Sequence, residues 1–437
     1  MRVRLDYGRD GLDVELPDAL DPLVIRRPGA DPLPDPVAAV RAACAQPIGV
    51  PALAELARGR KSAVVVISDR TRPIPYAVVL PPLLDALEAA GIAREHIEIL
   101  VATGLHRPCT SDELVEMAGS DVVTRYRVRN HAARAAEEHV HLGRTTGGTE
   151  ILIDRGYLEA ELKILTGLIE PHLMAGYSGG AKGVATGIAA TDTIRRTHGP
   201  VMLESEVGPG IVEGNPFRAD LLEVARRAGV DFLVNVAVDR QHRLTGVFAG
   251  DLEEAHAAGM AAVERQVRVD LPAPADIVVT SSGGHPLDLT FYQAIKGPVA
   301  ALNMVRRGGT VILAASMAEG LGSVDFRRML DRLRAGDDAM TLLTAPGFFC
   351  IDQWMVQHLD QVLRQVSLVV VSGELDPDAL HGLPLERAGS VEEAVAAALR
   401  RSGPRARVAV IPEGPYVLAT VRGRTLPLGR GAHDAAA

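Results

Sequence analysis

Four residues with reactive side chains lie in loop-like sequence, each close to glycine or proline or near a predicted helix end. They are His106, His172, Lys182 and His198. Imidazole takes up a proton near neutral pH and binds metals such as nickel and zinc. A lysine nitrogen can bond a cofactor covalently, and the glycines of 176-GYSGGAKG-183 would let a bulky group approach the backbone. Taken singly, these residues are more simply explained as structural histidines and a solvent-exposed lysine, so only their combination suggests a site.

The residue spacing argues against several common kinds of site. A phosphate-binding loop needs Gly before its lysine and Ser or Thr after it, whereas Ala181 precedes Lys182 and Gly183 follows it. The histidines match no zinc signature, and no predicted strand is followed by the G-x-G-x-x-G of a nicotinamide dehydrogenase. A pyridoxal-phosphate racemase would also use a lysine, but we identify no phosphate cup and no partner for a pyridinium nitrogen.

Side chains that suit a small anionic ligand lie in two other segments. In 68-SDRTRP-73, Arg72 could hold a carboxylate with two parallel hydrogen bonds, and Asp69 could orient Arg72 or a histidine. Gln293 and Lys296 are three residues apart, so they share one face of a predicted helix. A cation beside an amide can bind a carboxylate even in a chain whose net charge is −9.

The elements that would position these residues follow one pattern, in which short apolar runs are separated by amphipathic helical stretches. The runs are 63–69, 97–104, 276–284, 309–316, 367–373 and 407–414. This alternation predicts an α/β fold with parallel-rich sheets flanked by helices. The polar loops after the runs would meet at the carboxyl ends of the strands, where open α/β sheets bind ligands.

Local signals predict further elements and two domains. A hairpin should occupy residues 1–17, a helix 37–58, and Thr110 with Glu113 should form a capping box. A chain of 437 residues exceeds one hydrophobic core, so we expect two α/β domains with the active site in the cleft between them. The expected division is one discontinuous domain of residues 1–98 plus 268–423, a second domain of residues 105–260 that carries Lys182, and a flexible tail of residues 424–437.

Composition and charge argue against several partners. Arginines are dispersed among acidic residues, so we expect no nucleic-acid partner. No apolar run reaches the length of a membrane span, and the alternating start differs from a signal peptide. The three cysteines are far apart, which favours a reducing cytoplasm. Nothing in the sequence indicates an oligomeric state.

At this point the residues match a known pattern: the chain resembles the nickel-pincer family of lactate racemases and related 2-hydroxyacid racemases and epimerases. The matching segments occur in the family's order, and they are 68-SDRTRP-73, 102-ATGLHRP-108, 169-IEPHLMAGYSGGAK-182, His198, 291-FYQAIKG-297, 318-AEGLG-322 and 353-QW-354. The resemblance implies nickel held in a pyridinium-3-thioamide-5-thiocarboxylate mononucleotide, the nickel-pincer nucleotide. Lys182 would anchor this cofactor covalently, Gly179 and Gly180 would lie against it, and His198 would bind the nickel.

The resemblance also implies roles for the remaining residues. His106 and His172 would alternate as general base and acid on either side of the substrate. The substrate-binding residues would be Asp69, Arg72, Tyr292, Gln293, Lys296 and Trp354. A 2-hydroxyacid would lose hydride from C2 to the cofactor, pass through a planar 2-keto acid, and regain hydride on the other face. Enzymes that synthesise the cofactor would then be partners in maturation.

Two alternatives remain open at this stage. Arg70, beside Arg72, could accept a second carboxylate, which would make the substrate a dicarboxylate such as malate. The protein could also be a non-catalytic relative that binds a small molecule with the same fold.

Overall fold

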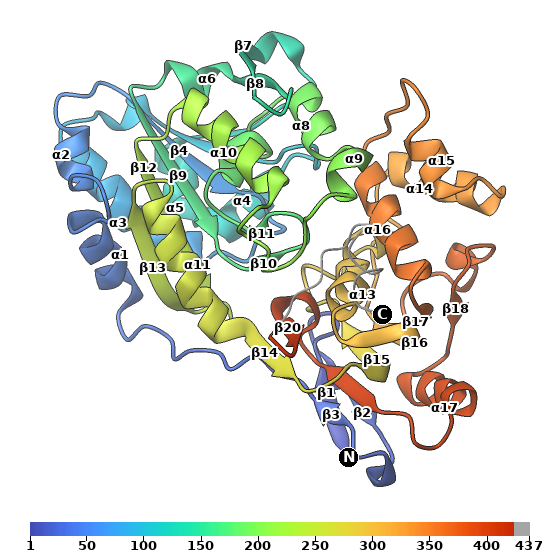
Figure 1. Ribbon diagram of the computed structural model, residues 1–437. Helices are drawn as coiled ribbons and strands as arrows, with labels where there is room; N and C mark the ends of the chain where they lie inside the picture. Colours follow the sequence, from blue (N-terminus) through green and yellow to red (C-terminus); the bar gives the residue numbers. More distant parts are fainter. Residues whose placement is uncertain (424–437) are drawn as a thin grey trace.

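The computed structural model describes residues 1–423 and confirms the predicted α/β class, with two six-stranded sheets flanked by helices (Figure 1). The predicted tail, residues 424–437, lies outside the described part. The first sheet has the order β13 (Leu244–Gly250), β12 (Phe232–Val238), β9 (Leu162–Leu168), β4 (Ala63–Ser68), β5 (Ile97–Ala102) and β6 (Arg127–Asn130). The second has the order β18 (Glu386–Arg387), β17 (Ser367–Val371), β16 (Val305–Ala314), β15 (Ala275–Ser281), β19 (Val408–Ile411) and β3 (Leu23–Val24).

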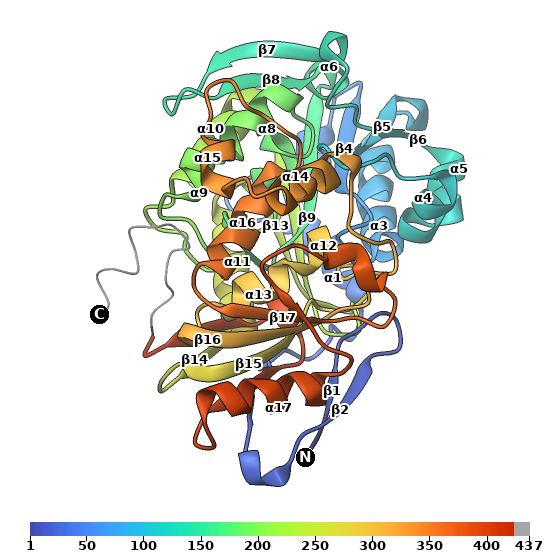
Figure 2. The same cartoon turned by 90° about the vertical axis from the view of Figure 1, so that its right-hand side faces the viewer.

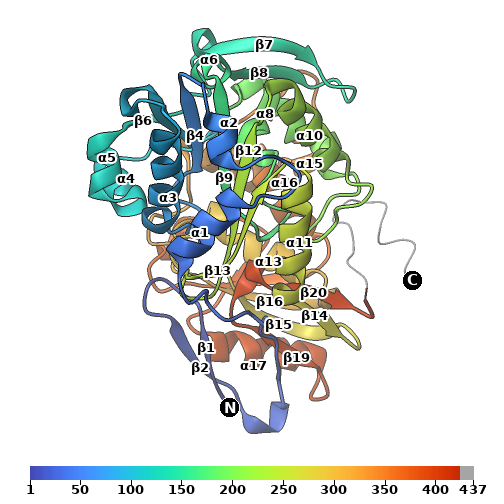
Figure 3. The same cartoon turned by 90° about the vertical axis from the view of Figure 1, so that its left-hand side faces the viewer.

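The central strand of the first sheet shows why an apolar run becomes a strand with two buried faces. In β4, Val64 and Val66 point to one hydrophobic core, and Val65 and Ile67 point to another. Helices α1 (Pro36–Ala45) and α3 (Tyr76–Ala89) cover the second of these faces (Figure 3). Helix α10 (Pro216–Ala228) packs against the first face. Alternate residues of a parallel strand are therefore buried in opposite directions.

The second sheet is parallel throughout and is also covered on both faces. Helix α17 (Val391–Ser402) lies under one face, and α13 (Lys296–Ala301) and α16 (Gln353–Leu363) lie on the other (Figure 2). The predicted N-terminal hairpin is present as β1 (Arg2–Leu5) and β2 (Leu12–Glu15), and it packs in the same core as α17.

Strand pairing differs from the expected division of the chain. We expected residues 1–98 to group with 268–423, but β4 and β5 pair in the first sheet with β9 and β6. Only β3 and the hairpin of the N-terminal segment pack with the second sheet. Strand pairing is a long-range property, and the local apolar pattern of β4 does not reveal which strand lies beside it.

The predicted helix 37–58 is also interrupted. It consists of α1 and the short α2 (Leu53–Ala57), separated by the sequence 46-QPIGVP-51. Pro47 and Pro51 lack an amide hydrogen, and Gly49 has a φ of 76°, so this segment cannot continue a helix. None of the helices in residues 1–423 has the length and apolarity needed to cross a lipid bilayer.

Candidate active site

One cavity gathers nearly all of the residues singled out from the sequence. It encloses about 1050 Å³ of empty space, counting the part that opens to solvent. The predicted residues that line it are Asp69, Arg72, His106, His172, Gly179, Lys182, His198, Tyr292, Gln293, Lys296 and Trp354. Of the proposed set, only Gly180 is not among the lining residues.

The topology of the first sheet explains the position of this cavity. From β4 the chain proceeds to β5 and β6 on one side of the sheet, and then to β9, β12 and β13 on the other. The loops after β4 and β9 therefore diverge, which leaves a crevice at the carboxyl ends of these strands. Asp69, which directly follows β4, lines this crevice. Thr166 and Leu168, near the end of β9, line it as well. Residues of α12 (Phe291–Ala294), α13 and α16 close the opposite wall.

His106 is oriented by a carboxylate. The loop after β5 turns back through a hydrogen bond from the His106 amide to the Thr103 carbonyl, and Nδ1 of His106 lies 2.6 Å from Oδ2 of Asp69. Burial alone would raise the pKa of Asp69, but the charge of His106 and the hydrogen bonds from His106 and Thr71 hold this pKa below its usual range. Asp69 is therefore ionised, and it accepts the Nδ1 proton of His106. The Nε2 atom of His106 is left free to exchange a proton.

His172 is held differently, by backbone amides. It lies in the short strand β10 (Pro171–His172), and the amides of Met174 and Ala175 donate to its Nδ1 at 3.2 and 3.1 Å. An amide can only donate, so Nδ1 is unprotonated and the ring proton lies on Nε2. Burial, followed by the nearby charge of Lys182, lowers the pKa of His172 well below its usual value. His106 and His172 are thus held in different ways, His106 through its Nδ1 by a carboxylate and His172 through its Nδ1 by two amide donors.

The loop before Lys182 is shaped by two side chains beneath it. Gly179 and Gly180 have φ values of 81° and 53°, which favour glycine, and an added Cβ at these positions would overlap Asn235 and His256, respectively. The Gly180 amide donates to Oδ1 of Asn235 at 2.9 Å, and Nε2 of His256 lies 2.8 Å from the Ser178 carbonyl. Packing within the protein is therefore one reason why these two positions are glycine.

This packing predicts a difference between two glycine substitutions. Gly180→Ala should destabilise the protein by roughly 1–3 kcal/mol, because it adds a clash with His256 to the strain of a positive φ. Gly214→Ala is the matched control, since Gly214 has a φ of 70° but no atom within 4 Å of an added Cβ. Thermal unfolding of both variants should show the larger loss of stability for Gly180→Ala. Equal losses would mean that the contact with His256 is unimportant.

Two of the four lysines of the chain line the cavity. These are Lys182, which begins the short helix α7 (Lys182–Ala185), and Lys296, which begins α13; the others are Lys61 and Lys163. Within residues 1–423, neither cavity ammonium has a hydrogen bond or salt bridge to another residue. Burial and the charge of Arg72 lower the pKa of Lys182 to about 8 and that of Lys296 to about 7. Each amine therefore loses its proton more easily than an exposed lysine, which makes it a better nucleophile near neutral pH.

His198 lies between two aromatic side chains at the end of helix α8 (Thr191–Thr197). Its ring centroid is 4.9 Å from that of Trp354 and 5.4 Å from that of Phe217. Nδ1 lies 3.0 Å from the Thr197 hydroxyl, which leaves Nε2 without a partner within residues 1–423. Burial and the charge of Lys182 lower the pKa of His198 to about 3. The imidazole is therefore neutral, the form that binds a metal.

Each wall of the cavity carries a group that suits a carboxylate or a hydroxyl. Arg72, in the loop after β4, forms an ion pair with Glu170. Oε1 of Gln293 is buried and has no hydrogen-bond partner within the described residues. An unpaired buried acceptor is costly, so this atom is suited to a donor on a bound molecule.

Residues 7–209 match the model of the lactate racemase N-terminal domain, and residues 271–419 match that of the lactate racemase C-terminal domain. The lactate racemase of Lactiplantibacillus plantarum is 37% identical over 381 residues, covering 85% of this chain and 88% of that protein. The lactate racemase of Thermoanaerobacterium thermosaccharolyticum is 32% identical over 421 residues, covering 95% and 98%.

The chain belongs to the lactate racemase family. Membership makes the protein an isomerase of the racemase type.

Solved structures agree with this family assignment. The lactate racemase apoprotein of T. thermosaccharolyticum superposes with a TM-score of 0.89 at 31% identity, covering 96% of this chain and all of that one. A Thermotoga maritima protein with a TM-score of 0.69 and 17% identity covers 89% of this chain and 99% of its own, and it shows the fold alone.

Three residues that contact the site residues were not predicted from the sequence. Glu170 pairs with Arg72, and Asn235 and His256 hold the loop before Lys182. Glu170 lies inside the segment 169–182, whose resemblance to the family was recognised, and its position two residues before His172 was the available signal. Asn235 interrupts the apolar strand β12, and a buried amide in such a run signals a specific hydrogen bond.

Proposed function

We propose that the protein racemises a lactate-like 2-hydroxyacid with a nickel-pincer nucleotide anchored on Lys182. The observation that carries this proposal is the meeting of His106, His172, Lys182 and His198 around one cavity in a chain of the lactate racemase family. The substrate named for its relatives is lactate. The proposal extends that substrate class, and the roles of the four residues, to this chain.

The residues around the cavity fit the proposed cofactor. Lys182 offers an amine without a protein partner, and His198 offers a neutral imidazole with a free Nε2. Within residues 1–423, there is no group of three or more His, Cys, Asp or Glu side chains placed to hold a metal ion. This is compatible with a nickel ion that takes one ligand from His198 and the others from the pincer. Gly183 also lines the cavity, and an added Cβ there would meet only Leu165, at 3.9 Å.

When bound, the nickel-pincer nucleotide would accept hydride from C2 of the substrate and return it to either face. The chain's own residues would handle the proton. His106, oriented by Asp69, would accept the hydroxyl proton of one enantiomer at Nε2, while His172 would donate a hydrogen bond from its own Nε2. For the opposite enantiomer His172 would accept the hydroxyl proton at Nε2, which requires the tautomer of His172 with its proton on Nδ1 and without the two amide bonds to that atom. Each imidazole would thus serve one enantiomer, which is why a racemase would need both.

A single carboxylate suits the cations of the cavity. If Lys182 is used by the cofactor, the cations that remain in the cavity are Lys296 and Arg72, the latter paired with Glu170. Arg70, the candidate for a second carboxylate, does not line the cavity and instead pairs with Glu113 and Glu319, each at 3.3 Å. This favours a monocarboxylate such as lactate over a dicarboxylate such as malate.

Racemisation of pure enantiomers tests the proposed function. The protein should be produced together with the enzymes that synthesise the cofactor, and then incubated separately with each enantiomer of lactate and of malate. Chiral chromatography should show both lactate enantiomers approaching an equal mixture, with malate converted far more slowly. A protein that carries the cofactor but racemises neither acid would contradict the proposed substrate class. A protein that never acquires the cofactor would support the non-catalytic binding alternative.

A further inference from the structure

Three segments far apart in the sequence meet behind the wall of the cavity opposite the first sheet. They are the loop around 316–323, helix α12 and the start of α16. The amides of Phe291 and Tyr292 donate to the carbonyls of Gly320 and Leu321, which fixes the loop on α12. Tyr292 and Trp354, from the other two segments, line the cavity. The roles proposed above assign no function to the loop or to Asp352, which precedes α16.

Asp352 is unusual for the residue that precedes a helix. An aspartate at this position normally caps the helix with its side chain, but Asp352 makes no such bond. Its φ of 69° is one that residues other than glycine rarely adopt, and holding such a backbone costs on the order of 1–3 kcal/mol. Its side chain is instead buried and directed at two hydroxyl groups, those of Ser323 and Tyr292. The Ser323 hydroxyl donates to Oδ2 at 2.5 Å.

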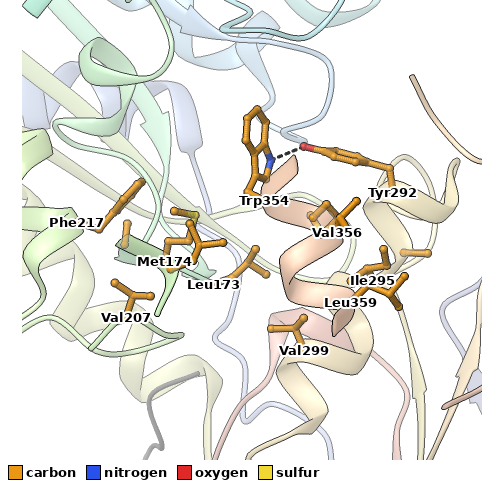
Figure 4. Close-up of a cluster of buried hydrophobic side chains, with 14 of the residues drawn as sticks. Leu173, Met174, Val207, Phe217, Tyr292, Ile295, Val299, Trp354, Val356 and Leu359 are labelled. Carbon is orange, nitrogen blue, oxygen red and sulfur yellow. Dashed lines mark hydrogen bonds between the residues drawn. The ribbon is translucent and has the colours of Figure 1, made fainter. Parts of the chain in front are cut away.

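The hydrogen bonds continue from Asp352 to the cavity. The Tyr292 hydroxyl accepts a hydrogen bond from Nε1 of Trp354 at 2.8 Å (Figure 4). Burial and the neighbouring Asp352 carboxylate together raise the pKa of this hydroxyl well above its usual value. The indole of Trp354 is 4.9 Å, centroid to centroid, from the ring of His198, which Phe217 contacts from another side. A carboxylate that fixes the direction of the tyrosine hydroxyl leaves one oxygen lone pair aimed at the indole.

We propose that Asp352 is a positioning residue, which acts through the Tyr292 hydroxyl to hold Trp354 against His198. The proposal rests on the proposed function only for the roles given to two residues, namely that His198 binds the metal and that Trp354 lies beside the substrate. The hydrogen-bonded chain itself is a property of the protein without cofactor. Loss of groups that orient a metal-binding histidine typically costs about 10-fold or more in activity.

The position of Trp354 can be measured directly, because it is the only tryptophan of the chain. Its fluorescence should be recorded for the cofactor-free protein and for Asp352→Ala, Asp352→Asn and Tyr292→Phe. In Asp352→Ala and Tyr292→Phe, emission should shift to longer wavelength and acrylamide should quench it more strongly, because the indole becomes more mobile and more hydrated. Asp352→Asn should resemble the wild type, since its amide oxygen can still accept from Tyr292. Asp325→Ala is the matched control, because it removes a nearby carboxylate that pairs with Arg328.

A double variant separates this role from simple stabilisation. If Asp352 acts through Tyr292, then Asp352→Ala should cause no further change in Trp354 fluorescence in the Tyr292→Phe background. In cofactor-loaded enzyme, kcat/KM should fall about 10-fold in Asp352→Ala and recover in Asp352→Asn. Unchanged fluorescence in Asp352→Ala, or an additive change in the double variant, would overturn the proposal. If Asp352→Ala does not fold, wild-type fluorescence in Tyr292→Phe would overturn it. Because fluorescence is read without cofactor, these outcomes do not depend on the proposed racemase activity.

Discussion

In the His106→Ala variant, racemisation should stop, yet one enantiomer of the substrate should still be oxidised to its 2-keto acid. In His172→Ala the other enantiomer should be oxidised. Each imidazole is expected to take the hydroxyl proton from one enantiomer only, so removing one leaves the half-reaction of the other. General acid–base catalysis is typically worth about 10²–10⁴-fold, and racemisation should fall by a factor in this range.

The two histidines lie in the same cavity but are held by different partners. His106 is backed by the ionised Asp69 and His172 by two backbone amides, and both line the same cavity. The prediction is tested by acid-quenched single turnovers, in which each loaded variant is mixed with one pure enantiomer and the 2-keto acid is measured. His96→Ala is a suitable control, because His96 is exposed and lies at the amino end of β5, away from the cavity. Oxidation of both enantiomers by either variant would contradict the two-base account.

The second large effect should come from Lys182→Ala. This variant should lose nickel during gel filtration and should have no measurable racemase activity, a loss of at least about 10⁶-fold if the whole redox step depends on the cofactor. The physical reason is that Lys182 is the proposed covalent link, whereas His198 alone would give the metal a single protein ligand. Nickel content and activity of the purified variant provide the measurement.

Lys296→Ala is the control that makes the Lys182 result specific. Lys296 lines the same cavity and also has a lowered pKa, so chemical reactivity alone would allow either lysine to be the anchor. If Lys296 binds the substrate carboxylate, its alanine variant should keep nickel and show a raised KM. Retained nickel and activity in Lys182→Ala, together with their loss in Lys296→Ala, would exchange the roles of the two lysines.

Local sequence signals predicted the elements that local interactions determine. The run 63–69 became β4, and Thr110 with Glu113 forms the predicted capping box. The prediction of one helix over 37–58 was wrong in its middle, because Pro47, Gly49 and Pro51 interrupt the helix between α1 and α2. The placement of β4 and β5 in the first sheet could not be read from their own residues, because it depends on pairing with β9, about 100 residues away in sequence.

The candidate site was more predictable than the packing beneath it. Residues that follow parallel strands meet at one edge of a sheet, so Asp69 and His106 could be expected close together, and the structure brings them within 2.6 Å. Asn235, His256 and Asp352 act on this site from segments with no recognisable local motif. Their roles depend on where distant side chains converge, which only the folded arrangement reveals.

The intact mass of the protein shows whether Lys182 carries the nickel-pincer nucleotide. Wild type, Lys182→Ala and Lys296→Ala should each be produced with the enzymes that synthesise the cofactor. We expect an added mass equal to that of the nickel-pincer nucleotide on wild type and Lys296→Ala, and none on Lys182→Ala. An unmodified wild type would contradict this expectation, provided that a known lactate racemase made in the same cells acquires the cofactor. An adduct that persists in Lys182→Ala would contradict the assignment of the anchor.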